Sequence, residues 1–332
     1  VIRRVMPTVI ANELVGVQPM TGPVGQIHTL RVRYSETTND ASAGNTDTTA
    51  GEEALSPFKI AEAYSGDLAT AKAANTAAKE GTAGRKMSIQ IMKQTVEAKS
   101  RKLSARWTFE AAQDAQSMHG IDVEAEIMAA LAQEITAEID QEVLQSLVTL
   151  SGTAAQTYDQ AAVSGTATFV GDEHAALAVQ INRVSNLIAQ RTRRGAGNWA
   201  VVSPFALTIL QSATTSAFAR TTEGTFEAPT NTKMVGTLNS AMKVYVNTYA
   251  ADSAPVLIGY KGTSESDAAA FYCPYIPLMS SGVVLDPSSF EPVVSFMTRY
   301  GYVELSNSAS SLGNAADYLG NVAITDGNVS FS

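Results

Sequence analysis

The chain has 332 residues, of which 45% are hydrophobic and 17% charged, so it can bury a sizeable core and exceeds the length at which one core usually stops growing. Its formal net charge of −9 argues against the large basic face that nucleic-acid phosphates require. Its one cysteine excludes an intrachain disulfide framework, and no apolar run approaches the roughly 18 to 20 residues of a membrane helix. A secreted binding module and a membrane protein are both disfavoured, and the low charge density fits a surface that other protein covers.

The first 25 residues combine many turn formers with many apolar side chains. The prolines and glycines prevent a long helix, because proline removes a hydrogen-bond donor and glycine adds backbone freedom. The apolar side chains must then be buried against something outside the segment, and a neighbouring subunit is the natural candidate. We therefore predict an extended arm whose candidate contact residues are Val15, Val17, Pro19, Met20 and Pro23.

A protruding ribbon is predicted next. Alternating polar and apolar residues indicate a strand at 26–34 and further strands within 87–108. The intervening residues 35–85 are rich in Ala, Thr and Gly and are interpreted as an insertion at the tip of a hairpin. An isolated two-stranded ribbon is marginal in water, so Met87, Ile89 and Ile91 should face a partner surface.

Three helices are predicted between residues 108 and 195. The first runs from a cap at Thr108 to a stop at Gly120, and the second from Asp122 to about Val148. Apolar residues of the second helix recur every four positions, which overshoots one turn of 3.6 residues, so the apolar stripe wraps around the helix. That pattern predicts a central strut touched on successive sides. A connection with a strand-like stretch at 166–170 leads to the third helix, from Asp172 to about Arg191, with Gly195 as its stop.

The remainder of the chain is predicted to be mixed α+β. A helix from Pro204 to about Ser212 should begin at a Ser203 cap. Short strands are expected at 199–202, 243–247, 256–260, 271–275 and 293–304.

No catalytic, cofactor or metal site is predicted. The three histidines, His28, His119 and His174, lie in different predicted elements and lack zinc-ligand spacing. Cys273 lies in an apolar, aromatic setting and is interpreted as a buried structural thiol. Residues 81–86 lack the full spacing of a phosphate loop. An enzyme with an unrecognised site stays open as an alternative, and its mark would be a concave pocket with perturbed titratable groups.

The densest basic cluster is Arg191, Arg193 and Arg194, at the predicted C-terminal end of the third helix. These residues suit the negative end of the helix dipole. The alternative is a functional one, in which Arg193 and Arg194 form an intersubunit salt bridge or contact DNA.

Four segments of the chain resemble the major capsid proteins of T-even-type tailed bacteriophages. They are ELVGVQPMTGPVG at 13–25, VEAKSRKLSARWTFEAAQDAQSMHGIDVEAEI at 96–127, YCPYIPL at 272–278 and TRYG at 298–301, which contains Arg299, a further candidate contact residue. The resemblance implies the α+β HK97-type capsid fold. Its parts would be an N-terminal arm at 1–25, an extended loop at 26–105, a peripheral domain at 106–195 and 286–332 with a spine helix at 122–148, and an axial domain at 196–285.

The resemblance also implies a function without catalysis. The chain would be a virion protein that self-assembles into hexamers of an icosahedral or prolate shell around double-stranded DNA, without sequence-specific binding, in the host bacterial cytoplasm. Its partners would be further copies of itself, the vertex protein, the portal, the scaffold, the prohead protease and possible decoration proteins, with no cofactor and no membrane. The start at Val1 fits removal of a propeptide. The pentameric vertex protein and an encapsulin-like compartment shell are the alternatives of the same class.

Overall fold

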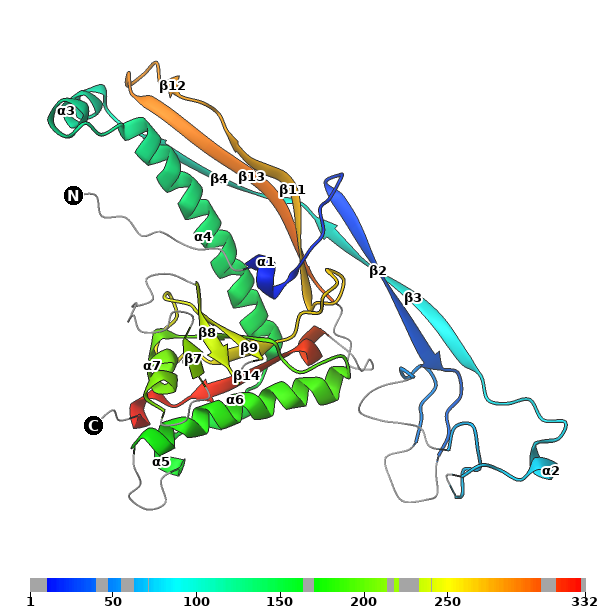
Figure 1. Ribbon diagram of the computed structural model, residues 1–332. Coiled ribbons are helices and arrows are strands. Elements are labelled where there is room, and N and C mark those ends of the chain that lie inside the picture. The colour runs from blue at the N-terminus through cyan, green and yellow to red at the C-terminus, as the bar shows by residue number, and fades with distance from the viewer. Residues whose placement is uncertain are drawn as a thin grey trace.

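A computed structural model describes residues 11–39, 47–54, 63–70, 72–163, 170–213, 218–220, 233–239, 241–305 and 315–329. Figure 1 shows a long helix, α4, with a long sheet along its upper half and a second, helix-covered sheet at its lower end. A two-stranded ribbon projects away from both sheets. The helices are α1 (Ala11–Leu14), α2 (Thr76–Lys79), α3 (Phe109–His119), α4 (Val123–Ser151), α5 (Gln160–Val163), α6 (Val170–Thr192) and α7 (Pro204–Ser212).

Helix α4 is the strut that the sequence pattern predicts. Its N-terminus is capped by Asp122, whose carboxylate accepts a hydrogen bond from the Glu124 backbone N–H at 3.1 Å. At the upper half, Leu131 and Ile135 pack against strand residues of the long sheet. At the lower half, Val143, Leu144 and Leu147 pack against residues of the second sheet and against the N-terminal segment. The wrapping apolar stripe therefore joins two cores along one helix, and the predicted strut is confirmed.

The ends of the other helices test the predicted caps. Thr108 accepts a hydrogen bond from Ala111 N–H, and Gly120 ends α3 in the left-handed conformation, as predicted. Ser203 caps α7 in the same way through Ala206 N–H. The predicted stop of α6 at Gly195 is wrong, because Arg193 already adopts a φ of +49° and ends the helix. Gly195 instead lies where the Tyr260 ring approaches the backbone, since an added Cβ would be 2.8 Å from it.

The seven-stranded sheet is built from strands of the second half of the chain and one short strand that follows α4. Helices α6 and α7 cover one of its faces, where Ile181 and Ile209 join the largest apolar cluster, and α4 covers the other face. The strand order is β5 (Gln156–Tyr158), β14 (Leu319–Ile324), β10 (Val256–Gly259), β6 (Trp199–Val202), β9 (Met242–Val246), β8 (Lys233–Leu238) and β7 (Phe218–Arg220).

The five-stranded sheet is organised around one long central strand, β13 (Pro292–Glu304). On one side β13 pairs with β4 (Lys99–Arg106), and on the other with β11 (Ala270–Ser280) and β12 (Val284–Leu285). A short arm strand, β1 (Gly16–Val17), adds to the outer edge of β11 in parallel orientation. Strand β11 is longer than the predicted 271–275, because register shifts after Pro274 and Ile276 accommodate its prolines as bulges.

The predicted division of the chain at 196 and 285 does not follow these sheets. Residues 270–285 pair with β13 in the five-stranded sheet, and not with the strands of 199–259. Conversely, β5, α6 and β14 belong to the seven-stranded sheet and its cover. The reason is that β11, β12 and β13 follow one another along the chain, and consecutive strands usually pair or neighbour each other in a sheet. Of the strand predicted at 166–170, residues 166–169 lie outside the described residues, and Val170 is the first residue of α6.

Candidate assembly surfaces

The ribbon consists of β2 (Val24–Tyr34) and β3 (Met87–Glu97), paired antiparallel over their whole length. Residues opposite each other in such a pair point to the same face. Val32 lies opposite Ile89 and Leu30 opposite Ile91, so the apolar side chains of the two strands form one continuous face. We call Leu30, Val32, Met87, Ile89 and Ile91 the ribbon face.

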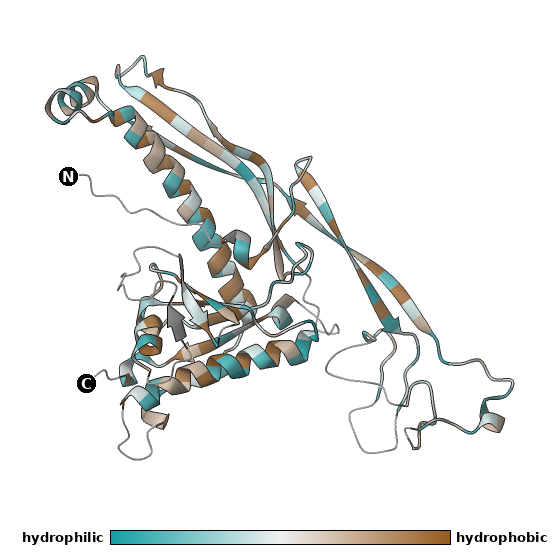
Figure 2. Cartoon of the chain, viewed as in Figure 1, coloured by the Kyte–Doolittle hydropathy of each residue, from teal (hydrophilic) through white to brown (hydrophobic). Residues whose placement is uncertain are grey.

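The ribbon face is open to solvent in the single chain. Leu30, Ile89 and Ile91 are 63%, 69% and 67% exposed, and Met87 is also exposed. Figure 2 shows apolar bands along the projecting ribbon. Val32 is half-buried, because it packs against Tyr34, Ala54 and Tyr64 at the ribbon tip. A contiguous apolar surface of this kind marks an interaction site, whereas single exposed apolar residues do not. The three predicted ribbon contacts Met87, Ile89 and Ile91 are thus exposed on one face, as the alternation indicated.

The base of the ribbon is fixed to the long sheet by a small core of its own. Val96, Phe271 and Cys273 are buried together, with Met20 and Ile27 packed against them. Burial raises the pKa of the Cys273 thiol, as expected of a structural cysteine held in its neutral form. The ribbon therefore leaves the body from an anchored base.

Gly301 of β13 is the tightest point of this anchor, and its substitution should loosen the ribbon. An added Cβ would lie 2.5 Å from Val96 Cγ2 and 3.2 Å from the Glu97 carbonyl oxygen. We expect Gly301→Ala to cost about 1–3 kcal/mol of unfolding free energy, by overpacking, in chemical denaturation of the unassembled subunit. Gly84→Ala is the matched control, because a Cβ there meets nothing within 4 Å. Equal stability of the two variants would show that the base is not tightly packed.

The insertion at the ribbon tip has a folded core, at least over its described residues. Tyr34 and Tyr64 pack with Ala54, and their ring centroids are 4.6 Å apart. The buried Arg31 guanidinium pairs with Glu53 at 3.0 Å. Arg85 donates to three backbone carbonyls of residues 63–66, at 2.7 to 3.4 Å. The predicted insertion at 35–85 is thus a small module tied back to the strands that carry it.

The predicted arm contacts divide into buried and exposed residues. Val15 is fully buried in its own chain, beside Leu14 and Leu147, so it is unavailable to a partner and that prediction is wrong. Val17 is half-buried, and its N–H donates to Glu265 Oε2 at 2.8 Å. Met20 packs at the ribbon base, whereas Pro19 and Pro23 remain exposed. Within residues 13–25, Leu14 and Val15 are buried and Val17 and Met20 are half-buried by their own subunit, which the sequence pattern alone could not reveal.

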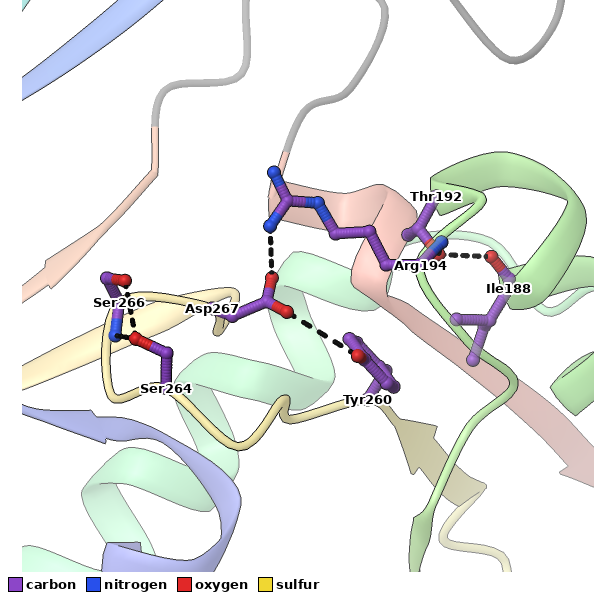
Figure 3. A network of polar contacts seen from close by, with 7 residues as sticks. All are labelled: Ile188, Thr192, Arg194, Tyr260, Ser264, Ser266 and Asp267. Carbon is purple, nitrogen blue, oxygen red and sulfur yellow. Dashed lines mark hydrogen bonds and ion pairs between the residues drawn. The ribbon is translucent and has the colours of Figure 1, made fainter.

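The predicted basic contacts also have partners within the chain. Arg194 pairs with Asp267 at 2.8 Å, and Asp267 accepts a second hydrogen bond from Tyr260 at 3.4 Å (Figure 3). The pKa of Arg194 is raised, mainly by the field of Tyr318 and then by Asp267. Arg193 ends α6, and Arg299 lies over the Tyr275 ring at 5.2 Å. Arg194 therefore has an intrachain partner, but its side chain is 57% exposed, so its intersubunit role stays a prediction.

The sequence reading missed a polar network that ties the long sheet to α4. Arg101 of β4 donates to Glu138 at 3.0 Å, to Glu142 at 2.7 Å and to the Tyr300 hydroxyl at 2.7 Å, and Tyr300 itself bonds to Glu142. Burial would by itself raise the pKa of Glu142, but the hydrogen bonds from Tyr300 and Arg101 outweigh it and lower that pKa below its ordinary value. Burial and the bond to Glu142 raise the pKa of Tyr300 to about 12.

This network should make stability depend on acid pH. A carboxyl whose pKa is lowered on folding contributes stability above its unfolded pKa, and that stability is lost as the pH falls through the folded value. We expect Glu142→Gln to lower unfolding free energy at pH 7 by up to about 1 kcal/mol, as for partly exposed pairs, and the difference to vanish toward pH 3. Denaturation between pH 3 and 7 measures this, with the exposed Glu134→Gln as control. A difference independent of pH would contradict the assignment.

A second exposed apolar surface lies at the far end of α4, where α3 meets β12 (Figure 1). Phe290 is 71% exposed and adopts a φ of +54° that bulky residues rarely take. Its ring packs against that of Phe109 in a tilted arrangement, with 5.5 Å between ring centroids. Beside it runs a groove of about 620 Å³. Its lining includes Trp107, Phe109, Ile121, Val123, Val283, Leu285 and Pro292, with the carboxylates of Asp122 and Glu124. In the sequence, the apolar run at 283–285 beside a turn was the feature that could have indicated this exposed surface.

The described residues offer little for catalysis or metal binding. His174 is fully buried, and its Nδ1 bonds to the Ser212 hydroxyl, which ties α6 to α7. No group of three or more His, Cys, Asp or Glu side chains within the described ranges could hold a metal ion. Over the same residues, none of the helices combines the length and apolar character that a membrane crossing needs.

The arrangement of long helix, two sheets and protruding ribbon is shared with solved phage capsids. The chain superposes on a chain of the bacteriophage PhiM1 mature capsid with a TM-score of 0.57 at 12% identity, covering 98% of this chain and 90% of that one. For the capsid of Myoviridae phage XM1 the TM-score is 0.55 at 10% identity, with 97% and 94% covered. The predicted HK97-type capsid fold is confirmed.

Sequence comparison identifies the family. The model of the major capsid protein Gp23 family matches residues 1–324, so the chain belongs to that family. It is 29% identical to the major capsid protein of Vibrio phage KVP40, over 94% of this chain and 77% of that protein. It is 30% identical to that of Enterobacteria phage T4, over 90% and 73%. The chain is a structural, shell-forming subunit of a tailed-phage virion, and this membership speaks against an enzyme.

Proposed function

We propose that the chain forms hexameric capsomers in which each ribbon lies across the next copy. Head-to-tail contacts related by a rotation that closes form a ring, and each copy then both offers a ribbon and receives one. The observation that carries this proposal is the ribbon face, which is apolar, solvent-exposed and anchored at its base. Only a further subunit can cover it without bending the anchored ribbon back.

The sheets suggest how the subunit is divided within the capsomer. We assign the peripheral domain to α3, α4 and the five-stranded sheet, and the axial domain near the ring centre to the seven-stranded sheet with α6 and α7. This division replaces the one drawn from the sequence at residues 196 and 285. As the shell forms, the five-stranded sheet would be held to α4 by the Arg101–Glu142–Tyr300 network. The segment that follows α6 would be held to the segment before β11 by the Arg194–Asp267 pair.

The shell would enclose double-stranded DNA without gripping it. A net charge of −9 disfavours tight binding to the phosphates of DNA. Assembly in the host cytoplasm would involve the vertex protein, portal, scaffold and prohead protease, and decoration proteins could bind the finished shell.

Native mass spectrometry of capsomers from the expressed chain tests the proposal. Six copies are expected. Five copies would favour the vertex role instead, and a stable monomer at high concentration would contradict both. Electron microscopy of the chain co-expressed with its scaffold should show closed shells.

A further inference from the structure

We propose that His28 and Lys93 form a pH-sensitive switch in the ribbon, which weakens the contact between copies when His28 gains a proton. The inference rests on the proposed function, because it concerns the same ribbon and takes the next copy as its partner. It adds regulation to that contact, which forms readily at neutral pH and weakens in mild acid.

His28 and Lys93 border the ribbon face at its end toward the body. They lie opposite each other in the ladder between β2 and β3, two residues along from the pair Leu30 and Ile91. Residues two apart on a strand point to the same side, so this pair projects from the same side of the ribbon as the ribbon face. Both side chains are exposed, and neither has a hydrogen bond or ion pair within the described part of the chain. A copy that covers Leu30 and Ile91 therefore also reaches this pair.

The backbone hydrogen bonds of the ribbon show that the two side chains are close. At the tip, the Tyr34 N–H donates to the Glu52 carbonyl oxygen. The Val32 carbonyl oxygen accepts from the Ala54 N–H, so the backbone groups of Val32 and Tyr34 point away from β3. These directions alternate along a strand, and the ladder has no register shift, so His28 also points its backbone groups away from β3. His28 and its partner thus form a non-hydrogen-bonded pair, with Cα atoms about 4.5 Å apart and the side chains closest.

The charged groups around this pair do not neutralise it. The first acid along the same side of the ribbon is Glu97, four residues further along β3 and about 13 Å away. Strand β13 contacts the ribbon at its base, where Arg299 lies over a tyrosine ring and Glu304 accepts from a tyrosine hydroxyl. At the tip, Glu53 is paired with Arg31. The nearest charge to a protonated imidazole at position 28 is therefore the ammonium group opposite.

Protonation of His28 opposes the contact for two physical reasons. Histidine changes its charge between pH 8 and 5, so mild acid places two positive charges side by side with Lys93. In water their repulsion is weak, but a covering subunit lowers the effective dielectric constant and strengthens the repulsion several-fold. The covered imidazolium also loses its hydration. Because every copy in a ring carries one such pair, the dependence of ring formation on pH should be steep.

Sedimentation of the expressed full chain between pH 8 and 5 measures the switch. We expect the concentration at which half of the chain is in rings to rise at least tenfold from pH 7.5 to pH 5.5. In His28→Gln the rise should be less than twofold, and His28→Lys should need the higher concentration already at pH 7.5. His119→Gln is the matched control and should keep the tenfold rise, because His119 is an exposed histidine of α3, outside the ribbon.

A second variant tests the role of the neighbouring charge. Lys93→Gln removes the repulsion and leaves only the loss of hydration, so its rise should be at most threefold. A ring equilibrium that does not change with pH, an undiminished rise in His28→Gln or Lys93→Gln, or stronger association at pH 5.5 would each overturn the switch and leave the proposed ring intact. A wild-type chain that forms no ring even at pH 7.5 would contradict the proposed function, and the switch with it.

Discussion

Replacing Ile89 and Ile91 together by aspartate should abolish shell formation and leave the fold of the subunit intact. Both side chains are about two-thirds exposed in the single chain, so no core contact is lost. In an assembled interface each isoleucine contributes about 1.5–3 kcal/mol through burial. Each aspartate would instead bring a carboxylate out of water, which costs several kcal/mol more. Electron microscopy and sedimentation of the expressed variant would show soluble subunits in place of shells.

The matched control for this variant is Gln90→Asp, between the two isoleucines on the opposite face of β3. It introduces the same charge on the same strand without touching the ribbon face, so shells should still form. Normal shells from the Ile89→Asp, Ile91→Asp variant would remove the ribbon face from the interface. Loss of secondary structure in the unassembled variant would show instead that these residues stabilise the fold.

The second large effect is expected at Val15, and it concerns folding of the subunit. Val15 is fully buried between α4 and the sheets, beside Leu14 and Leu147. Val15→Asp would place an uncompensated charge in that core, at a cost of about 3–5 kcal/mol. Against the roughly 5–15 kcal/mol by which domains are typically stable, such a loss is severe. Thermal unfolding of the unassembled subunit measures it.

Gln18→Asp is the control for Val15→Asp, because Gln18 is exposed and its backbone N–H, which the substitution keeps, donates to the Tyr272 carbonyl oxygen. It should change stability by less than about 0.5 kcal/mol. For the same reason, a deletion of residues 1–25 should destabilise the subunit itself before any failure of assembly can be seen. A Val15→Asp subunit as stable as the Gln18→Asp subunit would mean that the arm is not part of the core.

What could be predicted from the sequence was local. Thr108, Gly120 and Ser203 act through bonds within a few residues, and their roles as caps are confirmed. The wrapping stripe of α4 and the alternation of Met87, Ile89 and Ile91 depend only on helix and strand periodicity, and both are confirmed.

What could not be predicted depends on contacts between distant segments. Val15 looked like an unsatisfied apolar residue because its cover comes from α4, far along the chain. The partner of Arg194, Asp267, is similarly remote, and so are Glu142 and Tyr300 for Arg101. Strands β5, β7, β8 and β14 are short or rich in small and polar residues, and pairing within the sheet overrides their weak local signals. The resemblance to a capsid family predicted the architecture, but not which side chains connect its helices and sheets.

The most direct test of the account is the accessibility of the ribbon face before and after assembly. Ile89→Cys places a thiol at the centre of that face, and buried Cys273 serves as the internal reference in the same molecule. Maleimide labelling of the introduced thiol should be rapid in unassembled subunits and at least tenfold slower in intact shells, with Cys273 slow in both. Equally rapid labelling at position 89 in intact shells would mean that the ribbon face remains uncovered, and that this apolar surface does not hold the shell together.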